Sequence, residues 1–410
     1  MIMTIYEIKK VFYKTNSKIA ILVLLFVMGI TCFFATSVKW IDENGDSHKG
    51  PAAVSHLRAA RKEWAGYLDE EKISKVIEEN VRIRTSPEAL SNNLQEIETA
   101  YGWGQGIMDI RDLLNSSFAS HFREYDYYRA DSLTKEDACN FYSNRILLLR
   151  EWLEDEANDQ YTKAEKEYLI SQYENMETPL YYDYMTGWSQ LFEYSATIVM
   201  LTMLVLAYLV AGIFSSEFSL KSDAIFFTSL HGRNKAVAAK IKAGFIIVTL
   251  VYFAAFILYT AITLLYLGVD GWNLAIQADG GHWKSFYNIT IWQAYLIIAI
   301  SGYIGCLFIS FLAMLASAKT KSAVFAVMIP VILLFIPSFL GNINNHIVQK
   351  ALGILPDQLL DTSMALKVFN LYSFGDIVVG AVPIIMVLYT VLTVVIIPFV
   401  YQEYRHKQIT

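Results

Sequence analysis

The side chains with the clearest capacity for chemistry are two runs of carboxylates, Asp69-Glu70-Glu71 and Glu154-Asp155-Glu156. Carboxylate oxygens are preferred ligands of Ca²⁺, but a calcium loop spaces them at alternate positions around a glycine. Neither run has that spacing. Charges of one sign on a predicted helix are typical of a solvent-facing surface. We favour that interpretation over a metal site.

The sequence carries no recognisable catalytic or nucleotide-binding pattern. It has no GxxxxGK[ST] phosphate loop, and no HExxH, CxxC or GxSxG. Its seven histidines are scattered, and we interpret His231 as a turn residue. We therefore expect no catalytic residue, no metal and no cofactor in this chain. An intramembrane enzyme would need buried acids, histidines or metal ligands, which the apolar segments lack.

A basic stretch from Ile213 to Lys242 lies between two long apolar runs. It predicts one amphipathic helix that turns at His231-Gly232. The adjacent Phe226 and Phe227 form an apolar patch that needs either a partner surface or the bilayer. We favour a partner surface. The basic residues of the stretch are Lys221, Arg233, Lys235, Lys240 and Lys242.

The elements that position this stretch are membrane spans. The 410 residues are 55% hydrophobic with a mean hydropathy of +0.36, and a span needs roughly 20 apolar residues. Six segments meet this length, and an all-α membrane protein with six transmembrane helices follows. The predicted spans are Ile19–Val38, Leu191–Phe214, Ile241–Leu267, Ile291–Ala316, Ala323–Leu340 and Ile377–Val400.

Basic residues fix the expected orientation. Thirteen of them precede the first span, fill the loops after the second and fourth spans, or follow the sixth, whereas the short opposite loops carry Lys284, Lys350 and Lys367. Because cytoplasmic loops carry the excess of Lys and Arg, both termini are predicted to be cytoplasmic. Ahead of the first span, apolar residues interleaved with Lys9 and Lys10 predict an interfacial helix.

The segment Lys39–Ser189 is then extracellular. It has 17 Lys and Arg against 29 Asp and Glu, a balance of −12 in a chain of net charge −6. The acidic charge belongs to this segment, and nothing in it favours nucleic-acid binding. Cys139 is its only cysteine, so no disulfide can form within it. The expected helices are Val54–Asn80, Ser86–Tyr101, Ile107–Ser117, Lys135–Glu156 and Lys163–Asn175.

Three features of the apolar segments bear on packing. The row Tyr181, Tyr182, Tyr184 and Trp188 suits an aromatic belt at the membrane interface, with a ligand-binding patch as the alternative. A face of small residues (Ser301, Gly305, Ala313 and Ser317) permits close helix contacts, within the chain or between two chains. Pro330, Pro337 and Pro383 bend the last two spans, and the loop 341–375 is apolar enough to form short helices that dip into the membrane.

Together these residues resemble the membrane subunit of a type-2 (ABC-2) ATP-binding-cassette exporter, a bacterial permease with a large insertion between its first two spans. The resemblance covers roughly residues 1–38 and 190–410. It rests on the interfacial helix, the six spans, the loop before the sixth span and the sequence Glu217…TSLHGRNKAVAAK. The commoner form of that sequence has a proline where Ser-Leu-His stands here.

The resemblance implies specific roles. Residues 217–233 would form a coupling helix seated in a groove of a separate ABC ATPase subunit, which would bind ATP and Mg²⁺. Phe226, Phe227 and Leu230 would be its apolar anchor, while Arg233 and Lys235 would meet the ATPase or lipid phosphates. The docking residues implied are Glu217, Phe226, Phe227, Leu230, Gly232, Arg233 and Lys235.

The expected organisation is therefore an interfacial helix and first span (1–38), an extracellular helical domain (39–189), and spans two to six with the coupling helix (190–410). The expected function is export of an amphipathic or lipid-like substrate from the cell membrane, an antimicrobial peptide among the candidates, with a second permease subunit as partner. A rival interpretation is a membrane-anchored receptor whose extracellular domain binds a peptide. It accounts for that domain, but it leaves the basic inner loop unexplained.

Overall fold

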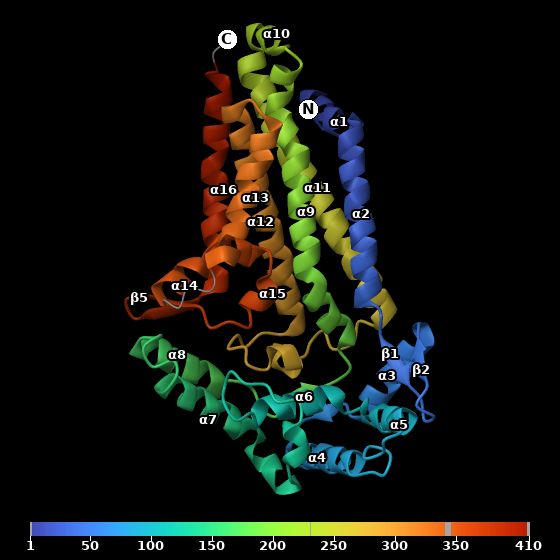
Figure 1. The fold of residues 1–410 in the computed structure, drawn as a ribbon. Helices are drawn as coiled ribbons and strands as arrows, with labels where there is room; N and C mark the ends of the chain where they lie inside the picture. Colours follow the sequence, from blue (N-terminus) through green and yellow to red (C-terminus); the bar gives the residue numbers. More distant parts are fainter. Residues whose placement is uncertain (1, 230, 341–345, 408–410) are drawn as a thin grey trace.

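The computed structural model describes residues 2–229, 231–340 and 346–407. The chain is mostly helical with little sheet. Long helices run side by side, and a separate group of shorter helices lies across one end (Figure 1). Both termini and α10 (Asp223–Thr228) lie at the opposite end. We call these the domain end and the α10 end.

Five helices are long and apolar enough to cross a membrane. Most of each predicted apolar segment lies in a helix, although α2 ends at Ala35, before the expected Val38, and α16 starts later than expected because Ile377–Gly380 forms strand β6. A sixth helix, α13 (Ala323–Leu340), contains Pro330 and Pro337, and its apolar part is shorter than a span. The five are α2 (Thr15–Ala35), α9 (Thr186–Ser219), α11 (Val237–Leu267), α12 (Ile291–Thr320) and α16 (Ala381–Arg405).

Helix α9 lies at the centre of the bundle and packs against α2, α11, α12 and α13, whereas α16 packs mainly on α12. The small-residue face of α12 makes its close contacts within the chain. Ser317 Oγ donates to the Ala211 carbonyl at 2.5 Å, and a Cβ at Gly305 would lie only 2.8 Å from Met203 Cε. Small side chains are therefore needed where α12 meets α9, which resolves the choice between contacts within and between chains for this face.

Residues 39–189 form the group of elements at the domain end, which we call the insert domain. Its helices are joined by short 3₁₀ turns at Arg129–Ser132 and Lys135–Asn140. In order the elements are β1 (Lys39–Ile41), β2 (Ser47–Lys49), α3 (Pro51–Glu63), β3 (Gly66–Tyr67), α4 (Glu70–Arg84), α5 (Leu94–Gly104), α6 (Met108–Ser117), α7 (Phe141–Glu154), α8 (Lys163–Glu174) and β4 (Tyr181–Tyr182). Strand β1 pairs with β2, and β3 with β4, both antiparallel.

Predicted helix positions in this domain are correct for α6 and α8. Thr162 and Glu165 form a capping box at the start of α8. The helix expected over Val54–Asn80 is wrong: it is divided into α3 and α4 because β3 pairs with β4. The helix expected from Ser86 starts at Leu94, since the Asn93 side chain accepts from Gln95 N. Its residues Leu90 and Leu94, apolar and four positions apart, are both exposed.

The insert domain is firmly seated on the bundle. One hydrophobic core runs without a break from Ile73 and Leu113 to Phe192 and Ile247. Buried Arg145 donates from Nε to the Trp283 carbonyl at 3.1 Å. The domain and the long helices therefore share one core, while α7 and α8 form a second cluster with Phe286, Phe369 and Leu371.

The loop before α16 lies at the domain end and contains several short elements. The described part of the loop before α16 contains α14 (His346–Leu352), a 3₁₀ turn at Pro356–Leu359, α15 (Thr362–Ala365) and the hairpin of β5 (Leu371–Phe374) and β6 (Ile377–Gly380). Short helices are thus confirmed there, although residues 341–345 lie outside the described residues.

The prediction of an aromatic belt at the membrane interface is wrong for three of its four residues. Tyr182, Tyr184 and Trp188 are buried, and only Tyr181 is exposed. The Tyr184 hydroxyl donates to the Leu267 carbonyl at 2.7 Å. These rings therefore pack inside the protein.

Candidate docking site at the α10 end

A buried lysine organises the base of the α10 end. Lys240, at the start of α11, has no exposed surface. Its Nζ donates to Glu217 Oε1 at 2.8 Å, to Glu7 Oε2 at 3.1 Å and to the Ile213 carbonyl at 2.7 Å. An ammonium group withdrawn from water is tolerated only when paired and hydrogen-bonded in this way.

Glu217, in the last turn of α9, is the second centre of the same cluster. Its Oε1 also accepts from Lys10 Nζ at 2.7 Å, and its Oε2 accepts from the Tyr404 hydroxyl at 3.2 Å. One carboxylate therefore connects α1 (Ile2–Tyr13), α9, α11 and α16. We call Glu7, Lys10, Glu217, Lys240 and Tyr404 the ion cluster.

The two phenylalanines of α10 lie on its inner side. Their rings pack on Tyr404, with centroids 5.8 Å away for Phe226 and 5.2 Å for Phe227. Phe227 is only 4% exposed, and Phe226 is partly buried. The expectation of an exposed Phe-Phe pair is therefore wrong, because the pair closes over Tyr404 and joins α10 to the end of α16.

Gly232 makes the turn behind α10 possible. A Cβ at this position would lie 1.8 Å from the Phe226 carbonyl oxygen and 2.7 Å from Ser229 Oγ. Only a residue without a side chain fits such an approach. The expected single helix is consequently two short pieces, α10 and a π-helical turn over Gly232–Ala236, with His231 in the turn as predicted.

Arg233 binds the backbone at the end of α16. Its guanidinium donates from Nη1 to the carbonyl oxygens of Arg405 at 2.7 Å and Lys407 at 3.0 Å, which are carbonyls that a helix end leaves unpaired. It also lies 4.9 Å from the Phe227 ring centroid. Lys235 is exposed, whereas Leu230 lies outside the described residues.

The outer surface of the α10 end is apolar in a different place from that predicted. Leu220 is 68% exposed and Ile225 is 76% exposed. The sequence signal for Ile225 was available: two positions along a helix turn a side chain by about 200°, so Ile225 and Phe227 cannot share a face. Lys240 and Tyr404 were also missed as partners of Glu217, because they are distant in sequence.

The structure thus brings five of the implied docking residues together at the α10 end, and Lys235 stands apart. Tyr404 contacts Glu217, Phe226 and Phe227 directly. Gly232 lies against Phe226, and Arg233 lies against Phe227. Within residues 2–229, 231–340 and 346–407, no group of three or more His, Cys, Asp or Glu is placed to hold a metal. Asp69, from one of the two acidic runs, caps α4 by accepting from Lys72 N at 2.9 Å. No family model, curated protein or solved structure matches this chain.

Proposed function

We propose that this chain is the permease subunit of an ABC exporter of the type-2 class, driven by a separate ATPase subunit. The observation that supports this best is the construction of the α10 end, where a short helix with an exposed apolar tip stands on a fully paired ionic base. In this proposal the chain crosses the cell membrane six times, both termini and α10 are cytoplasmic, and the insert domain is extracellular.

Force applied to α10 would reach the long helices by a short route. Phe226 and Phe227 pack on Tyr404, whose hydroxyl donates to Glu217, and Glu217 joins α9 to α11 through Lys240. Paired buried charges resist separation because each would be left uncompensated. Movement of α10 would therefore displace several helices together.

The docking roles assigned from the resemblance change accordingly. Leu220 and Ile225 would enter the ATPase groove, because exposed apolar side chains gathered at one tip favour a partner surface. Phe226, Phe227, Gly232 and Arg233 would hold the shape of that tip, and Lys235 would meet the ATPase or lipid phosphates. The substrate would be amphipathic or lipid-like, an antimicrobial peptide among the candidates, and a second permease chain would complete the membrane unit.

The test uses the chain co-purified with an ABC ATPase encoded beside it. We expect Ile225→Ser to reduce the ATPase stimulation by the permease at least about tenfold, as loss of a central apolar anchor does at interfaces. Leu94→Ser is the matched control, because Leu94 is 78% exposed at the opposite end of the molecule. Failure to form a complex, or equal effects of the two variants, would contradict the proposal.

A receptor remains the second candidate, and one observation favours it: a cavity lies where the insert domain meets the start of α9. A receptor needs no ATPase partner, so the co-purification separates the two functions.

A further inference from the structure

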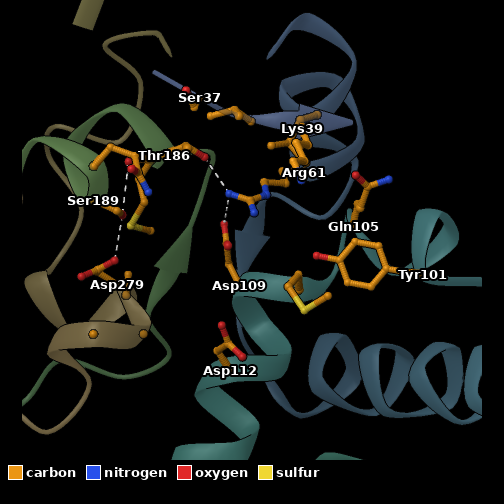
Figure 2. Close-up of a pocket in the computed structure, with 18 residues that line it drawn as sticks. Ser37, Lys39, Arg61, Tyr101, Gln105, Asp109, Asp112, Thr186, Ser189 and Asp279 are labelled. Atoms are coloured by element: carbon orange, nitrogen blue, oxygen red, sulfur yellow. Dashed lines mark hydrogen bonds and ion pairs between the residues drawn. The ribbon is translucent and has the colours of Figure 1, made fainter. Parts of the chain in front are cut away.

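A cavity of about 380 Å³ lies at the domain end, between the insert domain and the long helices. That volume is within the usual range of small-ligand pockets, about 300–1,000 Å³. Its wall comes from the end of α2 and β1, from α3, α5 and α6, from the first turn of α9, and from the 3₁₀ turns before α12 (Figure 2). A ligand bound there would contact both parts of the molecule.

Three aspartates and one arginine give the cavity its charge. Asp109, Asp112 and Asp279 line it together with Arg61, and Lys39 lies exposed at its rim. Two cations outside the wall act on these carboxylates, Arg111 on Asp112 and Lys367 on Asp279. Arg111 also donates to Asp131 at 3.0 Å.

Arg61 already makes two polar contacts within the protein. Its Nη1 donates to Thr186 Oγ1 at 2.6 Å and lies 2.9 Å from Asp109 Oδ2, so it neutralises Asp109 (Figure 2). Arg61 Nε is buried and has no hydrogen-bond partner among the described residues. This N–H donor lacks an acceptor, which a carbonyl oxygen of a bound peptide would supply.

The other two carboxylates differ in how well they are paired. Asp279 accepts from Ser189 Oγ at 2.7 Å, and its other oxygen lies 2.6 Å from His282 Nδ1. Asp112 accepts a single bond, from the Tyr125 hydroxyl to Oδ1 at 2.9 Å, and none is made to its Oδ2 among the described residues. Burial and the neighbouring Asp109 raise the pKa of Asp112.

We propose that this cavity binds the primary ammonium group of a lysine side chain in a cationic peptide, with Asp112 as the direct acceptor. A compact ammonium needs only the one oxygen that Asp112 leaves open, whereas a guanidinium favours two parallel oxygens. The cavity is larger than an ammonium group alone requires. The acidic balance of residues 39–189 attracts a polycation from a distance.

This inference deepens the proposed function, because it assigns a substrate class to an exporter of peptides, but binding itself needs no ATPase. The test measures binding of a labelled pentalysine to the purified chain in phosphatidylcholine nanodiscs. We expect Asp112→Asn to weaken binding at least about tenfold, the effect of one charge-assisted hydrogen bond. Asp159→Asn, at an exposed aspartate of the same domain, should leave binding unchanged.

A second variant covers the case in which Asp112→Asn fails to fold. Lys39 is exposed and lines the cavity, so Lys39→Glu replaces a positive charge there by a negative one and should tighten binding of a polycation severalfold. Side-chain acetylation of the peptide should abolish binding.

Pentalysine affinity that neither substitution changes would overturn the proposal. If phosphatidylethanolamine nanodiscs compete with pentalysine for the chain, the bound ammonium belongs to a lipid headgroup, and the assignment to a peptide is wrong. The ATPase assay with Ile225→Ser is separate, so either proposal can fail alone.

Discussion

The two ends of the molecule hold a carboxylate in opposite states, Glu217 on α9 at the α10 end and Asp112 on α6 at the domain end. At the α10 end, both oxygens of Glu217 are paired, and the cations that pair it come from α1 and α11. At the domain end, Asp112 has one hydrogen bond and faces a cavity. The comparison teaches that a buried carboxylate joins helices when its charge is matched and prepares a binding site when it is not.

Helix α9 connects the two arrangements. Its first turn contributes Thr186 and Ser189 to the cavity, and its last turn contributes Glu217 to the ion cluster. A helix of 34 residues extends for about 50 Å at 1.5 Å per residue. A ligand that displaces Arg61 from Thr186 would therefore act on the same rigid helix whose far end holds α10.

The largest expected effect tests whether the ion cluster holds the long helices together. Replacing Lys240→Met leaves Glu217 buried beside fewer cations, and removal of one partner of a buried pair costs about 3–5 kcal/mol of unfolding free energy. Thermal unfolding in detergent measures it. Lys242→Met is the matched control, because Lys242 is exposed two positions further along α11.

The double variant Lys240→Met with Glu217→Gln sharpens this test. It removes both buried charges, so we expect it to recover part of the stability lost in the single variant. A Lys240→Met protein as stable as the Lys242→Met control would show that the cluster does not hold the helices together.

A smaller effect is expected from Gly232→Ala. The new methyl group would meet the Phe226 carbonyl, and the turn behind α10 would have to shift, at a cost of about 1–3 kcal/mol. Gly29→Ala is the control, because a Cβ there meets nothing within 4 Å. We expect a lower unfolding temperature and faster protease cleavage near Lys221 only in the first variant. Identical cleavage of both variants would argue against a fixed α10.

The sequence predicted the helices better than it predicted the site. Apolar length was enough for the long helices, and the Thr162–Glu165 capping box was enough for the start of α8. The break between α3 and α4 was not predictable locally, since it depends on a strand 114 residues later in the chain, with Tyr67 opposite Tyr181. Glu217 was identified as a docking residue, but its pairing with Lys240 and Tyr404 requires three helices to meet. The cavity left no local signal, because its wall is assembled from separate elements.

The smallest expected effect is that of Asp112→Asn, which is compared with the equivalent change from carboxylate to amide at Glu217. Glu217→Gln replaces a paired carboxylate and should destabilise the protein by about 1–3 kcal/mol, because bonds to two lysines weaken. Asp112→Asn removes an uncompensated charge and keeps the bond from Tyr125, so it should stabilise the protein by less than about 1 kcal/mol at pH 7. Equilibrium unfolding of the two variants beside the unmodified chain gives both signs.

The pH dependence of the Asp112→Asn effect provides the internal check. Burial raises the pKa of Asp112 in the folded state, so the folded protein takes up its proton at a higher pH than the unfolded chain does. As the pH falls through that raised pKa, the unmodified protein loses the penalty of the buried charge and its stability rises toward that of Asp112→Asn. The difference between the two should therefore shrink on acidification. A difference that is constant with pH, or a destabilising Asp112→Asn, would show that Asp112 is as well compensated as Glu217, and the contrast between the two ends of the molecule would be lost.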